Sequence, residues 1–136
     1  MKSVRIISIS LGISVFTFGV LKFFNPFKGW YSVQIMTSGL SKFSYWLGIA
    51  GEIFAGALFL VSMILRRRLP QRIFRFAIMT ASIAVIVMMV MAIIVHLNPN
   101  VPANVLPLKI KPPIIPALFL LLGFLNIMLV ARSAKR

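Results

Sequence analysis

The sequence contains no cysteine, one acidic residue and one histidine. The lack of cysteine excludes disulfides, thiolate metal sites and thiol redox chemistry within this chain. One Glu and one His cannot complete a four-ligand metal shell, so we expect no metal site. Any redox role must therefore use a partner protein or a bound cofactor.

Charged residues as a whole are also scarce, and all but one of them are basic. They make up 12% of the 136 residues, whereas soluble domains carry about 25%. Hydrophobic residues make up 60%, which is enough for four spans of about 20 residues each. The fifteen Lys and Arg flank the apolar segments, whereas a nucleic-acid binder gathers its basic residues on a soluble face. The composition predicts an integral membrane protein in contact with lipid, and no nucleic-acid partner.

Four apolar stretches follow one another along the chain, each long enough for a membrane-spanning helix. They cover residues 4–24, 43–65, 74–97 and 114–130. The first has the charged start of a signal peptide, but its apolar middle is longer and no A-x-A-like cleavage site follows, so we interpret it as a retained span. The sequence therefore predicts an all-α fold, a single membrane domain of residues 1–136 that forms a four-transmembrane-helix bundle.

The basic residues predict the orientation of the bundle. Ten of them flank the spans on one side, including every arginine: Lys2, Arg5, Arg66, Arg67, Arg68, Arg72, Arg75, Arg132, Lys135 and Arg136. The other side has five, all lysines: Lys22, Lys28, Lys42, Lys109 and Lys111. Since Lys and Arg in short loops are retained in the cytoplasm, we expect cytoplasmic N- and C-termini. The run 66–68 is either an anchor at anionic lipid headgroups or a patch for an acidic protein.

The two outer loops differ in character. In the first, Phe27, Trp30, Tyr31 and Ile35 fall at helical spacing. This pattern predicts a short amphipathic helix that lies in the membrane interface. The second loop holds six of the eight prolines and is expected to be stiff and non-helical. It could serve as a lid over the outer end of the bundle or as a rigid connector.

Glu52 is the residue whose position the topology does not explain. It lies near the middle of the second span, where an ionisable side chain costs roughly 2.5 to 3.5 kcal/mol. Gly48 and Gly56 share its helical face, and Gly51 lies beside it. Because small residues at this spacing let another helix approach closely, we expect the carboxylate to face a neighbouring helix.

The first span offers a partner for that carboxylate. Gly19 and Lys22 share a face there, and a lysine stem can reach about one helical turn inward. His96 ends the third span at the same outer level. Two interpretations stay open. Glu52 is a proton acceptor or hydrogen-bond anchor in a small site, with Lys22 as counter-charge and His96 near its opening. Alternatively, the pair only fixes helix register and His96 meets interfacial water. Asn126, in the fourth span, is expected to form an interhelical hydrogen bond.

The run that begins FGVLK at the end of the first span and ends GEIFAGALFL in the second, together with the end of the third span, resembles the DoxX-like membrane proteins. The first motif of that family corresponds to Gly19, Lys22, Asn25 and Pro26; the next to Gly39 and Leu40; the glycine–glutamate motif of the second helix to Gly48, Gly51 and Glu52; and the end of the third helix to Val95 and His96. The resemblance covers about residues 16–97.

The resemblance implies a small four-helix protein of a bacterial inner membrane. Relatives in this family include a subunit of a thiosulfate:quinone oxidoreductase, a component of a mycobacterial membrane complex with superoxide dismutase and a sulfurtransferase, and a protein needed to mature methylamine dehydrogenase. The family therefore suggests a redox association, with the chemistry often in a partner.

Three hypotheses follow. The first is a membrane subunit of a redox or oxidative-stress complex, with a membrane or periplasmic redox protein as partner and a quinone or other small-molecule pocket at Lys22, Glu52 and His96. The second is a non-catalytic assembly or chaperone-like protein. The third is a small proton or solute conductor, for which a chain of this length would need to form a homo-oligomer.

Overall fold

The computed structural model describes residues 2–133, which form five α-helices and no β-strand. The helices are α1 (Lys2–Leu21), α2 (Phe27–Thr37), α3 (Lys42–Ile64), α4 (Gln71–Leu97) and α5 (Ile114–Ser133). Two single 3-10 turns, η1 (Ala103–Val105) and η2 (Pro107–Lys109), lie in the proline-rich connection. That connection was expected to be non-helical, which is wrong for these two turns and for Pro116, the last of its six prolines, which lies in the first turn of α5.

The helices α1, α3, α4 and α5 are long and apolar enough to cross a membrane. Each of them exposes large apolar side chains, among them Ile6, Phe54, Phe76 and Leu121. Such outward-facing side chains suit contact with lipid tails, which are as apolar as leucine. The predicted all-α architecture with four spans is confirmed to this extent, whereas the direction in which the bundle crosses a membrane stays a prediction.

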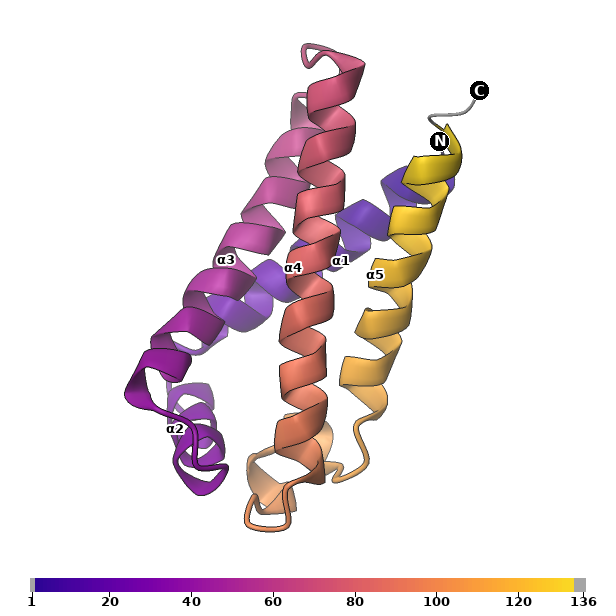
Figure 1. Ribbon diagram of the computed structural model, residues 1–136. Coiled ribbons are helices and arrows are strands. Elements are labelled where there is room, and N and C mark those ends of the chain that lie inside the picture. The colour runs from indigo at the N-terminus through magenta and orange to yellow at the C-terminus, as the bar shows by residue number, and fades with distance from the viewer. Residues whose placement is uncertain (1, 134–136) are drawn as a thin grey trace.

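The two ends of the bundle differ. α1 begins and α5 ends at the end where α3 connects to α4 (Figure 1). We call this the basic end, because Arg5, the run 66–68 and Arg132 lie there. The opposite end, formed by α2 and residues 98–113, is the loop end (Figure 1). Of the residues that predict the orientation, Lys135 and Arg136 lie outside the described part of the chain.

Each long helix packs on two others. α3 and α5 both contact α1 and α4, so the four helices close around one apolar core. α1 lies behind the other three and crosses them obliquely (Figure 1). The most buried core side chains include Leu11, Val15, Phe59, Phe74, Ile78 and Val85.

Glycines bring α1 and α3 into backbone contact. A Cβ atom on Gly56 would lie 2.6 Å from the backbone nitrogen of Phe16. One on Gly19 would lie 2.8 Å from Ile53 Cγ1, and one on Gly12 would lie 2.9 Å from Phe59 Cβ. Since real Cβ atoms essentially never come so near a neighbour, the helices can cross this closely only because these residues lack side chains.

The other two glycines around Glu52 face different partners. A Cβ on Gly48 would collide with the hydroxyl of Tyr31 in α2, and one on Gly51 would lie 2.9 Å from the Met88 sulfur in α4. Three helices, α1, α2 and α4, therefore pack against the glycine-rich segment of α3, and of these only α1 was expected. They surround the lone acidic residue with packed structure.

Asn126 joins three helices at the centre of the bundle. Its amide nitrogen donates to Ser8 Oγ on α1 at 2.9 Å and to Ser82 Oγ on α4 at 3.2 Å. All three side chains are fully buried. The predicted interhelical hydrogen bond is confirmed, and it fixes the relative register of α1, α4 and α5.

Replacing Gly56 by alanine should destabilise the bundle. The new methyl group would meet backbone atoms of Phe16, which cannot move aside without separating α1 from α3. Overpacking of this kind costs about 1 to 3 kcal/mol. We expect a lower thermal midpoint of helix unfolding for Gly56→Ala, measured by circular dichroism in detergent micelles.

Gly29→Ala is the matched control, because a Cβ there would meet only Asn25 Oδ1, at 3.9 Å. Gly51→Ala should fall between the two, since its nearest neighbour is the end of a flexible methionine. Equal midpoints for Gly56→Ala and Gly29→Ala would contradict the close crossing of α1 and α3.

Candidate functional site

An ion pair lies between α1 and α3 toward the loop end. Lys22 Nζ lies 2.6 Å from Glu52 Oε2, and the two side chains are 17% and 12% exposed. Lys22 follows directly after the last residue of α1, so its stem must turn back along the bundle to reach the carboxylate. Gly19 leaves the room for this, since a Cβ there would lie 3.1 Å from the Glu52 Cβ.

Tyr31 of α2 covers the ion pair. The Lys22 ammonium lies 4.1 Å from the centroid of the Tyr31 ring, a cation–π contact. The Tyr31 hydroxyl donates to the backbone carbonyl of Tyr45 at 3.1 Å, above the open position left by Gly48. We call Lys22, Glu52 and Tyr31 the polar site.

The Tyr31 hydroxyl stays protonated in this environment. Burial, and then the negative charge of Glu52, raise the pKa of Tyr31 above its usual value. A neutral tyrosine has one O–H, which here is donated to the Tyr45 carbonyl, so the donor left in the polar site is the Lys22 ammonium, beside the Glu52 carboxylate. These groups can bind a carbonyl or hydroxyl oxygen and can hold a proton close to it.

One oxygen of Glu52 is not occupied by the protein. Oε2 accepts from Lys22, whereas Oε1 accepts no hydrogen bond within residues 2–133. No fully buried side-chain oxygen or nitrogen in that part of the chain lacks a partner. The Glu52 side chain is 12% exposed, so Oε1 keeps unused acceptor capacity at a largely buried position.

His96 was expected near the opening of this site, and the structure gives it a polar contact within its own helix. Its ring is buried, with 4% of the residue exposed, and Nδ1 lies 2.8 Å from the carbonyl oxygen of Ala92, one turn back on α4. No hydrogen bond links His96 to Lys22 or Glu52 within residues 2–133. With 4% of the residue exposed, His96 has little contact with water, and its place near the opening of the site stays a prediction.

The proline-rich connection holds α2 in place. Gln34 Nε2 donates to the carbonyl of Val105 at 2.5 Å. Lys111 Nζ donates to the carbonyls of Asn98 and Val101 at 2.6 and 2.5 Å. Apolar residues of α2 and of the connection also pack together: Trp30, Val33, Val101, Val105 and Leu106. The connection thus braces the helix that carries Tyr31.

Tyr31 is the member of the site that the sequence analysis missed. Its spacing with Phe27 and Ile35 predicted only an interfacial aromatic helix. Tyr31 and Ile35 are buried against α3, whereas Phe27 is 39% exposed. The signal that could have identified Tyr31 is Gly48, because a glycine facing a short preceding helix leaves space for a large side chain.

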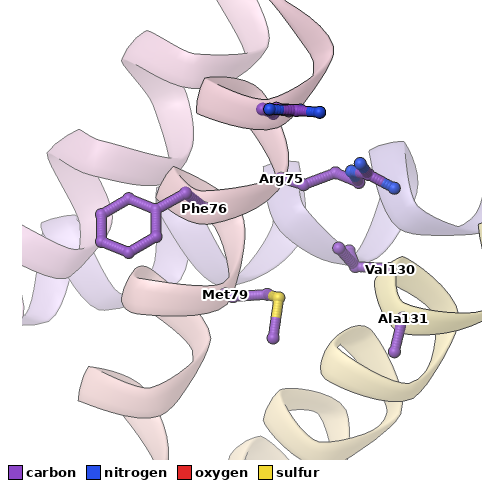
Figure 2. Close-up of a pocket in the computed structure, with 6 residues that line it drawn as sticks. Arg75, Phe76, Met79, Val130 and Ala131 are labelled. Atoms are coloured by element: carbon purple, nitrogen blue, oxygen red, sulfur yellow. The ribbon is translucent and has the colours of Figure 1, made fainter. Parts of the chain in front are cut away.

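The basic end carries two surface hollows, at the opposite end of the bundle from the polar site. The α4–α5 hollow, of about 380 Å³, is lined by Arg72, Arg75, Phe76, Met79, Val130 and Ala131. Figure 2 shows Arg75 and Met79 extending from α4 toward α5, whereas Phe76 points away. The second hollow lies between α1 and α3. Neither includes a residue of the polar site.

Comparison with known proteins gives no match: no protein-family model, no curated protein and no solved structure matches the chain. The likeness to DoxX-like proteins therefore depends on the sequence motifs alone.

Lys22→Met should destabilise the bundle more than removal of an exposed lysine. It leaves the Glu52 carboxylate without its counter-charge in a largely buried position, and breaking a buried pair in this way costs about 3 kcal/mol, or somewhat less at this partial exposure. The double variant Lys22→Met/Glu52→Met removes both charges and should recover most of the loss. Thermal midpoints in micelles measure both effects.

Lys42→Met is the control, since Lys42 is exposed and does not pair with Glu52. If Lys22→Met lowers the midpoint no more than Lys42→Met does, the pair does not stabilise the packing of α1 on α3.

Proposed function

We propose that this chain is a DoxX-like subunit of a redox or oxidative-stress complex in a bacterial inner membrane. In this proposal a partner protein carries the electron-transfer chemistry, because the chain has no cysteine and too few metal ligands of its own. The chain contributes the polar site, which binds the headgroup of a quinone or a similar small carbonyl compound. Both termini are cytoplasmic, so the polar site lies in the outer half of the membrane.

The observation that carries the proposal is the Lys22–Glu52 ion pair, largely buried between α1 and α3 and covered by the Tyr31 ring of α2. Ionisable groups at membrane depth mark ligand or proton pathways in most membrane proteins. A quinone headgroup has two carbonyl oxygens, and Lys22 can donate to one of them. The aromatic rings of Tyr31 and Tyr45, with centroids 4.8 Å apart, offer a surface for the flat headgroup.

Glu52 and Tyr31 have defined roles in this proposal. Glu52 Oε2 orients the Lys22 ammonium, and Oε1 can accept a proton or a hydrogen bond from a hydroxyl of a reduced headgroup. Tyr31 holds the ammonium against its ring face and excludes water from it. Electron transfer itself is assigned to the partner, so the chain binds and orients the ligand.

A second candidate function is a non-catalytic assembly protein that holds a membrane partner. The observation in its favour is the 2.6 Å ion pair, in which the two charges already compensate each other, between helices in close glycine contact. Such a pair can serve only to fix helix register. A third, proton or solute conduction by a homo-oligomer, has no specific contact in its favour.

The quinone proposal predicts that the chain retains quinone through the polar site. We expect about one quinone per chain when the protein is extracted from bacterial membranes in polymer-bounded nanodiscs and the lipid extract is quantified by chromatography. Glu52→Gln should lower retention by roughly tenfold, since hydrogen bonds to charged groups are worth about 1.5 to 3 kcal/mol. Tyr31→Phe keeps the ring and should lower retention less.

Lys42→Met, which removes a lysine outside the polar site, should retain quinone like the unaltered chain. Membrane abundance of each variant is measured in parallel. Quinone content equal to that of bulk lipid in the unaltered chain would refute the quinone proposal. Co-purification of a redox enzyme that persists in Lys22→Met/Glu52→Met would instead favour the assembly function.

A further inference from the structure

The second hollow at the basic end combines arginines with apolar side chains. We call it the α1–α3 groove. It has a volume of about 760 Å³ and is lined by Arg5 and Ile9 on α1, by Leu60, Met63 and Ile64 on α3, and by Arg66 and Arg67 just after α3. Three arginines from two separate parts of the chain therefore line the same groove, together with apolar side chains.

The chain offers these guanidinium groups no side-chain carboxylate. Its one acidic residue is Glu52, which is paired with Lys22. Ile64, at the end of α3, lies twelve residues further along the helix, or about 18 Å at about 1.5 Å per residue. Three positive charges at this distance from any compensating side chain favour binding of an external anion.

One of the three arginines is held in position. The Arg66 guanidinium lies 5.7 Å from the centroid of the Phe74 ring, which is 1% exposed and belongs to the core. Arg66 is half-buried, whereas Arg5 and Arg67 are exposed. The groove thus has one fixed guanidinium and two at its rim that can close on a ligand, an arrangement suited to the several oxygens of a phosphate group.

The apolar wall specifies which phosphate compound fits. Ile9 lies one helical turn, about 6 Å, below Arg5 toward the middle of the membrane. Leu60 and Ile64 form a similar step on α3, and Ile64 is 79% exposed beside the arginines. A soluble phosphate or an acidic peptide would leave this wall uncovered, whereas an acyl chain would cover it.

We propose that the α1–α3 groove is a binding site for an anionic phospholipid, whose phosphate contacts Arg5, Arg66 and Arg67 and whose acyl chain lies against Ile9, Leu60 and Ile64. Basic pockets between membrane helices at the cytoplasmic side recognise anionic headgroups in this way. The site is independent of the polar site and of the function proposed for it. The α4–α5 hollow of Figure 2 has two arginines, both from one helix, and is a weaker version of the same arrangement.

Native mass spectrometry of the purified full chain in neutral detergent micelles tests the site. The probes are phosphatidylglycerol and phosphatidylcholine with identical acyl chains, and orientation in a membrane does not affect the measurement. We expect the unaltered chain to retain phosphatidylglycerol preferentially. Arg5→Gln/Arg67→Gln should reduce its retention about twenty-fivefold, since each basic residue near a headgroup contributes about fivefold in affinity.

Arg68→Gln/Arg132→Gln is the control, because it removes the same charge from exposed arginines at the same end that do not line the groove. Its retention should stay within about twofold of the unaltered chain. An equal loss in both double variants would mean diffuse attraction of charge and would overturn the site, as would retention of both lipids alike by the unaltered chain. Circular dichroism checks that both variants keep their helices.

A second arm separates a lipid site from a simple phosphate site. Glycerol phosphate carries the charged group without acyl chains, and we expect no displacement of phosphatidylglycerol at equal concentration. Ile64→Ser, a change at an exposed position, should lower lipid retention without any change in charge. Displacement by glycerol phosphate, together with unchanged retention in Ile64→Ser, would show that the apolar wall is not used and would refute the lipid assignment.

Discussion

The close crossing of α1 and α3 is the constraint on which the polar site depends. Gly56 and Gly19 allow two backbones to approach so nearly that the end of α1 lies beside the middle of α3. Lys22, just beyond α1, is then within reach of Glu52. Without that crossing the lone acid would face lipid or an apolar core, where its charge would be costly. The close helix contact at these glycines thus allows the charge of Glu52 to be compensated inside the bundle.

The same glycine-rich segment also explains why α2 lies where it does. Gly48 leaves space at the surface of α3 that the Tyr31 hydroxyl fills, and Tyr31 in turn covers the Lys22 ammonium. The proline-rich connection holds α2 from the other side through Gln34. A buried backbone carbonyl without a hydrogen-bond donor is costly. Lys111 donates to carbonyls within the connection and so stabilises the loop end. Gln34 of α2 donates to the Val105 carbonyl and so helps to hold the helix that carries Tyr31.

The sequence predicts the spans and the proximity of Lys22 to Glu52, because both follow from regular helical geometry. Apolar length defines a span, and the spacing of Gly48, Glu52 and Gly56 defines a face. Which neighbouring helix packs on that face is less predictable, since small residues allow any helix to approach closely. Gly56 contacts α1 and Gly48 contacts α2. For His96 the sequence gives its level but not its direction, and its ring turns to the carbonyl of Ala92 instead of the ion pair.

The two ends of the bundle differ in how their basic side chains are compensated, because the chain has only one acidic residue. The chain has fifteen basic residues and one acid, and the acid forms its ion pair with Lys22, so fourteen basic side chains have no carboxylate side chain to compensate them. At the basic end the proposed anionic phospholipid supplies the compensating charge from outside the chain. At the polar site the compensation is internal. A ligand there must therefore compete with, or add to, an existing ion pair, and this favours a neutral hydrogen-bonding headgroup over a charged one.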